Sequence, residues 1–183
     1  MADEILIADY DPRWPGLFAE EDRLIRAILG RDLVAEVHHI GSTAVPGLAA
    51  KPIIDLLVVT PSLEEAKRHG VALLEVQGYS YWRDNPAPHR LFFVKGLPPR
   101  GPRTHHVHMV EADSPHGSSE VQDRLLFRDY LRIHPAEAQR YLALKHALAG
   151  KFPDDREAYT SGKDDYVAAV LAKARQARPG PPQ

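Results

Sequence analysis

The spacing of apolar residues divides the chain into a first part that alternates strands with helices and a second part that is helical throughout. Runs of β-branched and apolar residues predict strands over 4–8, 33–40, 52–60, 79–84, 89–96 and 104–112. Apolar spacings of three and four predict helices from Pro15 to Gly30 and over 63–77. The run at 52–60, PIIDLLVVT, is apolar almost throughout, which is typical of a strand buried on both faces.

Beyond about Val121 the pattern predicts three helices, over 119–133, 135–149 and 155–176. The charge changes sign here: residues 1–120 carry 12 basic and 17 acidic residues, whereas 121–183 carry 11 basic and 8 acidic residues. We expect an α/β (α+β) fold, with a mixed sheet and flanking helices over 1–118. We expect a C-terminal helical annex over 119–178 to pack on this sheet part and to form one structural unit with it. The tail at 179–183 has no apolar residue to bury and is expected to be disordered.

Composition narrows the classes of function. Of the 183 residues 44% are hydrophobic, enough for a buried core, and the formal net charge of −2 disfavours a nucleic-acid partner. The absence of cysteine excludes disulfides and thiol nucleophiles, so any metal must bind to His, Asp or Glu. No apolar stretch reaches the ~18 residues of a membrane helix, and the start of the chain is acidic, unlike a signal peptide. We expect a cytoplasmic protein without a membrane partner.

The stretch HHIGSTAVPGLAAKPIIDLLV at 38–58 holds the most informative candidate site. One predicted strand ends at Gly41-Ser42-Thr43, and the next carries Asp55 in its middle. Backbone N–H groups of the turn would meet a phosphate, and Asp55 would hold a divalent cation that bridges phosphate oxygens. The alternative is a tight turn beside a buried Asp that caps backbone donors. A buried carboxylate is costly unless it is paired or metal-bound, which favours the site.

Five segments together resemble the GrpB-like family: HIGSTAVPGLAAKPIIDLLV (39–58), YDPRWP (10–15), RTHHVHMVE (103–111), FRDYLRIHP (127–135) and YTSGKDDYV (159–167). This bacterial family is assigned to the nucleotidyltransferase superfamily and also occurs fused to dephospho-CoA kinase as a C-terminal domain. The resemblance implies a nucleotidyltransferase-like fold. In that fold Gly41 and Ser42 match the superfamily's Gly-Ser element, and Asp55 matches the first of its metal-binding carboxylates. It carries no settled reaction.

The histidines offer metal ligands where a carboxylate is missing. Polymerase-like transferases carry a second carboxylate two positions after the first, so that two metals can act together, but here that position is Leu57. Strand alternation places His106 and His108 on one face of the 104–112 strand. If that strand lies beside Asp55, these three residues, with His39, would hold one divalent metal such as Mg²⁺, Mn²⁺ or Zn²⁺. The alternative is that both imidazoles lie on a solvated face and bind nothing.

Three lysines are candidates for phosphate binding. Lys163 falls on the apolar stripe of the predicted helix at 155–176, four residues after Tyr159, where it would neutralise charge that develops in a reaction. Lys145 stands in the same relation to Tyr141, and Lys51 lies in the loop close to the Gly41 turn. The alternative for Lys145 and Lys163 is that both reach solvent over their tyrosines.

We therefore expect a cleft between sheet and helices that binds a phosphorylated small molecule, such as a nucleotide, with a divalent metal. Nucleotidyl or phosphoryl transfer, with Asp55 and Lys163 as catalytic residues, is the first hypothesis. A metal-dependent hydrolase with an Asp/His site is the second. A non-catalytic module that senses a ligand or assists a partner is the third.

Overall fold

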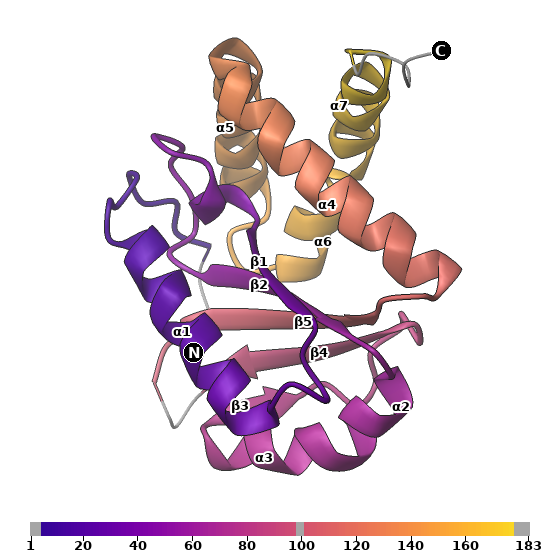
Figure 1. Cartoon of the computed structure of the whole chain (residues 1–183). Coiled ribbons are helices and arrows are strands. Elements are labelled where there is room, and N and C mark those ends of the chain that lie inside the picture. Colours follow the sequence, from indigo (N-terminus) through magenta and orange to yellow (C-terminus); the bar gives the residue numbers. More distant parts are fainter. Residues whose placement is uncertain (1–4, 98–100, 178–183) are drawn as a thin grey trace, which may run out of the picture.

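A five-stranded mixed sheet forms the centre of the fold (Figure 1). A computed structural model describes residues 5–97 and 101–177, so the predicted tail at 179–183 lies outside the described residues. The strands are β1 (Glu36–Ile40), β2 (Ile54–Thr60), β3 (Tyr79–Tyr81), β4 (Arg90–Lys95) and β5 (His105–Glu111). Their order is β1-β2-β5-β4-β3, with β2 and β5 parallel and the other pairs antiparallel. The parallel pair lies at the centre, and β2 is buried along most of its length as its apolar sequence predicts.

The first helices cover one face of this sheet. They are α1 (Trp14–Leu29) and a helical segment made of α2 (Leu63–Glu65), a π-helical turn (Ala66–Gly70) and α3 (Val71–Val76). Ile25 of α1 and Leu74 of α3 are fully buried in the main core, against alternate residues of β2, β4 and β5. The predicted helix after Pro15 is confirmed, with Gly30 as its C-cap at φ 74°.

The C-terminal helices cover the opposite face, as Figure 1 shows. They are α4 (Pro115–Ile133), α5 (Pro135–Lys151), α6 (Arg156–Ser161) and α7 (Asp164–Ala177). Val121 and Leu125 of α4 pack on the buried side chains of Ile40, Leu57 and Val110. Because these three side chains come from β1, β2 and β5, they identify the face of the sheet that meets the helices.

Three predicted elements differ from the structure. The predicted strand at 4–8 is, over its described residues, only an isolated bridge between Ala8 and Ala50. The predicted helix at 63–77 contains the π-helical turn, which ends at Gly70. The predicted helix at 155–176 is two helices, because α6 ends with Gly162 as its C-cap and α7 begins at Asp164.

In the ranges 5–97 and 101–177, no helix combines the length with the apolar character that spanning a bilayer requires.

Candidate functional site

Asp55 meets two histidines on the sheet face that the C-terminal helices cover. In the parallel register Asp55 lies opposite His106, and Leu57 lies opposite His108. The Asp55 Oδ1 atom lies 3.1 Å from His106 Nδ1 and 4.0 Å from His108 Nε2. The structure therefore brings together the three residues that strand alternation predicted as neighbours. They form one polar group on the parallel pair of strands, β2 and β5.

The charge states within this group are set by burial and by neighbouring charges. Burial alone would raise the pKa of Asp55, but the His106 hydrogen bond and the charges of His106, His108 and Lys51 lower it to about 2. Burial holds the pKa of His108 well below its usual range, and the charges of Arg124 and Arg90 lower it further. The carboxylate is thus ionised near neutral pH, and the imidazole of His108 is neutral.

Gly41 brings the backbone of the following turn against the Asp55 carboxylate. Its φ is 72°, and a Cβ atom at this position would overlap the Asp55 side chain. The chain then forms a 3-10 turn over Ser42–Ala44. The side chain of Arg132 in α4 donates to the Ala44 carbonyl oxygen at 2.9 Å, which fixes the turn to the helical half. A glycine is therefore required where the turn passes the carboxylate.

The side chain of His39, a predicted metal ligand, points away from Asp55, and the side chain of Thr43, predicted as a backbone donor, contacts the His39 ring. His39 lies opposite Leu56, on the sheet face away from Asp55, and its ring stacks on Phe18 of α1 with 4.7 Å between centroids. The buried Thr43 hydroxyl interacts with His39 Nε2 at 3.0 Å and with the Ile53 carbonyl oxygen at 3.4 Å. His39 therefore does not join the Asp55 group, and only the backbone of Thr43 is left to meet a ligand.

Three lysine ammonium groups gather on the helical side of the site. The Nζ atoms of Lys51 and Lys163 lie 4.6 and 4.3 Å from the centre of the same ring, that of Tyr159. Lys145 is 2% exposed, donates a hydrogen bond to the Ala49 carbonyl oxygen and lies over the ring of Tyr141. Lys163 occupies the link between α6 and α7 instead of a helical stripe. The two Tyr-Lys pairs of the sequence thus converge from different elements.

The ammonium groups of Lys51, Lys145 and Lys163 lie near other positive charges. Within the described ranges no carboxylate forms an ion pair with any of the three. Burial, followed by the charges of Lys163 and Lys51, lowers the pKa of Lys145 to about 7. Burial and the charges of Lys163 and Arg156 lower the pKa of Lys51 to about 8. Burial also lowers the pKa of Lys163, which the charge of Asp55 opposes.

The residues around Asp55 do not by themselves form a metal centre. In the part of the chain that the structure describes, no group of three or more His, Asp or Glu side chains is arranged to hold a metal ion. Asp55 and His106 are hydrogen-bonded to each other, and Leu57 takes the place of a second carboxylate. A two-metal centre therefore does not fit these residues, and Asp55 is left as a single ionised donor.

The sequence did not predict that arginines of α4 donate hydrogen bonds to backbone carbonyl groups of β1 and the following turn. Arg128 donates to the His39 carbonyl oxygen at 2.9 Å, in parallel with the Arg132 contact to Ala44. Phe92 of β4 also lies beside the site, with its ring centroid 5.2 Å from that of His106 and 4.8 Å from that of His108. The alternation of HRLFFVKG could have placed Phe92 on one face, but only the β4–β5 register places it on this one.

The arrangement of sheet, turn and helices defines a nucleotidyltransferase-like fold. The Cid1 poly(U) polymerase matches over 76% of this chain and 43% of its own, with a TM-score of 0.53 and 18% sequence identity, a likeness of fold alone. The crystal structure of the conserved protein GrpB from Enterococcus faecalis matches over 93% of this chain and 98% of its own, with a TM-score of 0.81 and 36% identity.

Sequence comparison gives the family. The GrpB protein family matches residues 4–173. The UPF0157 protein PA4798 of Pseudomonas aeruginosa is 49% identical over 173 residues, which are 94% of this chain and 68% of that protein. The chain belongs to the GrpB family.

Proposed function

We propose that the region between the sheet and the C-terminal helices binds a phosphorylated small molecule through Lys51, Lys163 and Lys145. The observation that carries this proposal is the group of three partly or fully buried ammonium groups without an ion pair in the described ranges. Ammonium groups removed from water lose hydration, and an anion placed among them restores a favourable charge balance. Phosphate oxygens suit this position because each accepts charge-assisted hydrogen bonds.

Asp55 supports one divalent cation only in company with the ligand. Mg²⁺ in proteins is commonly held by one or two carboxylates together with substrate phosphates. Asp55 would supply the single protein carboxylate, and phosphate oxygens would supply the further ligands that the described side chains do not. We therefore expect a cation to bind with the phosphorylated ligand, and weakly or not at all without it. Bound there, the cation would neutralise phosphate charge.

A hydrogen bond and an unpartnered atom support acid–base chemistry as a second candidate function. His106 Nδ1 bonds to Asp55, while its buried Nε2 atom has no hydrogen-bond partner in the described structure. A carboxylate that holds one imidazole nitrogen leaves the other free to accept a proton from water or from a hydroxyl group. Transfer to a hydroxyl acceptor and hydrolysis by water would both use such a base. If the variant His106→Asn loses catalytic turnover but still binds its ligand, this result would support acid–base chemistry as a function of the site.

Calorimetric titration with inorganic tripolyphosphate tests the binding proposal. We expect saturable binding that weakens about tenfold or more in Lys163→Ala and in Lys51→Ala, because each loses a charge-assisted contact. Lys67→Ala is the matched control, since Lys67 is exposed on the other side of the sheet and carries the same charge. Absence of binding to the wild type, or equal losses in all three variants, would overturn the proposal.

The same titration with Mn²⁺ tests the role of Asp55. Mn²⁺ alone should bind weakly. In the presence of each other, Mn²⁺ and tripolyphosphate should each bind more tightly than either does alone. Asp55→Asn should remove this mutual enhancement while leaving cation-free tripolyphosphate binding in place. Tight binding of Mn²⁺ alone would contradict the requirement for the ligand.

A further inference from the structure

A row of aromatic rings extends from the Asp55 group toward the far edge of the sheet. His106 and His108 contact Phe92 of β4, and the Phe92 ring lies 5.7 Å from that of Trp82 in an edge arrangement. The Trp82 backbone N–H also donates to the Phe92 carbonyl oxygen at 2.9 Å, which continues the strand pairing past the end of β3. These contacts place the row on the face that carries Asp55.

Trp82 is unusually exposed to solvent for a tryptophan. It is 50% exposed, whereas the other tryptophan, Trp14, is 3% exposed in the core of the opposite face. Large aromatic side chains are normally well buried, and an exposed one beside other rings offers a flat surface for a ligand. We call Trp82 and Phe92 the aromatic platform.

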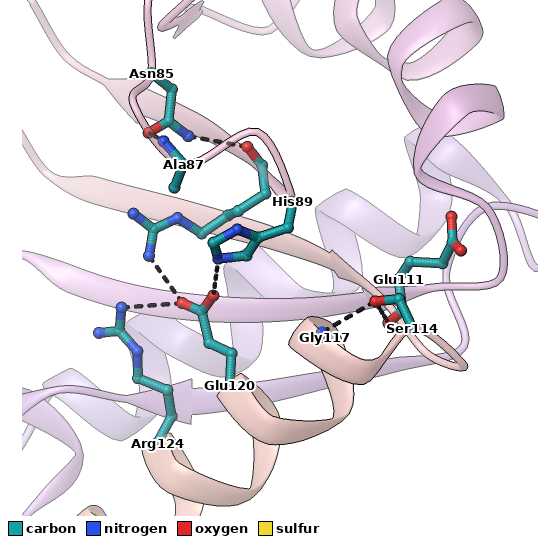
Figure 2. A network of polar contacts seen from close by, with 9 residues as sticks. Asn85, Ala87, His89, Glu111, Ser114, Gly117, Glu120 and Arg124 are labelled. Carbon is teal, nitrogen blue, oxygen red and sulfur yellow. Dashed lines mark hydrogen bonds and ion pairs between the residues drawn. The ribbon is translucent and has the colours of Figure 1, made fainter.

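The segment that carries Trp82 is held in place by polar contacts (Figure 2). Asn85 donates from its side chain to the Arg90 carbonyl oxygen at 2.9 Å and accepts from the Ala87 N–H at 3.2 Å. Glu120 of α4 accepts from Arg90 at 2.8 Å and from Arg124 at 3.0 Å, which ties the start of β4 to the helix. The platform is therefore preformed, because both ends of the loop that follows Trp82 are fixed.

A hollow lined by polar side chains lies at the start of β4. Its volume is about 370 Å³, and Arg90, Glu120 and Arg124 are part of its lining. Arg90 lies two positions before Phe92, so both side chains leave β4 on the same face. A flat ring stacked on the platform would have apolar surface beneath it and hydrogen-bonding groups near its edge.

We infer that the platform stacks the base of a nucleotide whose phosphates lie among the lysines. This inference rests on the proposed function and specifies its ligand as a nucleotide rather than a sugar phosphate or an inorganic polyphosphate. Three strand spacings separate β2 from the Trp82 segment, or about 14 Å. A nucleoside triphosphate in extended form spans such a distance from its terminal phosphate to its base. Phosphate, sugar and base would thus lie along one face of the sheet.

Tryptophan fluorescence and calorimetry with three probes test the inference: ATP, UTP and inorganic tripolyphosphate. We expect ATP and UTP to quench the emission of Trp82 and tripolyphosphate to leave it unchanged. In Trp82→Phe, whose remaining tryptophan is the buried Trp14, nucleotides should cause no quenching. In Trp82→Ala both nucleotides should bind about tenfold or more weakly, while tripolyphosphate should bind as to the wild type.

Val76→Ala is the control variant, since Val76 is an 82% exposed apolar residue on α3, on the other side of the sheet. Equal affinity of nucleotides and tripolyphosphate, with no effect of Trp82→Ala, would overturn the inference and leave the proposed phosphate site standing. Absence of binding by every probe would overturn both. Trp82 emission that depends on protein concentration, and not on nucleotide, would assign the platform to contact between copies of the chain and overturn the inference.

Discussion

At the scale of single residues, Lys145 shows how a buried cation links the site to the stability of the fold. Its ammonium group is 2% exposed and donates to a backbone carbonyl oxygen. Burial and two neighbouring lysines lower its pKa to about 7 from the ordinary 10.5. Below pH 7 the native and unfolded states both hold the proton, and the full cost of the buried charge is present.

The pH dependence of unfolding tests this account. Between pH 7 and 9 the unfolded chain binds more protons at Lys145 than the native state does, so the free energy of unfolding rises with pH. Lys145→Met should reduce this rise by about 2 kcal/mol, because one proton over one pH unit corresponds to ~1.4 kcal/mol and the native lysine is about half deprotonated at pH 7. Urea unfolding at both pH values measures it. Lys151→Met, an exposed change on the same helix, is the control, and an equal rise in both variants would contradict the account.

At the scale of elements, a buried ion pair joins α1 to the sheet on the face opposite the site. Glu21 of α1 is 5% exposed, and its two carboxylate oxygens accept from Lys95 Nζ of β4 at 2.7 and 2.8 Å. The Tyr79 hydroxyl of β3 donates to the same carboxylate. One acidic side chain thus fixes the helix against two neighbouring strands.

Glu21→Ala should lower the free energy of unfolding by about 2–4 kcal/mol. The substitution leaves the Lys95 ammonium and the Tyr79 hydroxyl without their acceptor, and breaking a buried pair on one side is strongly destabilising. Lys95 keeps 25% of its side chain exposed, so we place the loss below that of a fully buried pair. Chemical unfolding beside Glu20→Ala, an exposed neighbour, measures the difference. Tripolyphosphate binding should persist, and a variant as stable as the control would refute the estimate.

The sequence predicted the strands and helices better than it predicted the points at which a helix is interrupted. Period and composition located every strand of the sheet, and alternation placed His106 with His108 on one face. The break at Gly162 was missed because apolar residues at spacings of three and four continue on both sides of it. His39 was assigned to the wrong face because this depends on the β1–β2 register, in which His39 lies opposite Leu56 and Ile40 lies opposite Asp55.

At the scale of the whole molecule, the cationic group is assembled from both halves of the chain. Lys51 belongs to the connection between β1 and β2, whereas Lys145 belongs to α5 and Lys163 to the link between α6 and α7. Their like charges repel one another across the boundary between the halves: Lys163 lowers the pKa of Lys51, and both lower the pKa of Lys145. An anion bound between the three lysines would attract each of them and so offset their mutual repulsion.

Ligand binding should therefore stabilise both halves together. We expect tripolyphosphate to slow backbone hydrogen exchange at 41–51 and at the link between α6 and α7, because opening either segment must release the bound anion. Exchange in α3, which contacts the opposite face, should stay unchanged and serves as the internal control. The protection should disappear in Lys163→Ala and remain in Lys67→Ala. Slower exchange at only one of the two segments would show that one half alone holds the anion. The anion would then not bind between the two halves.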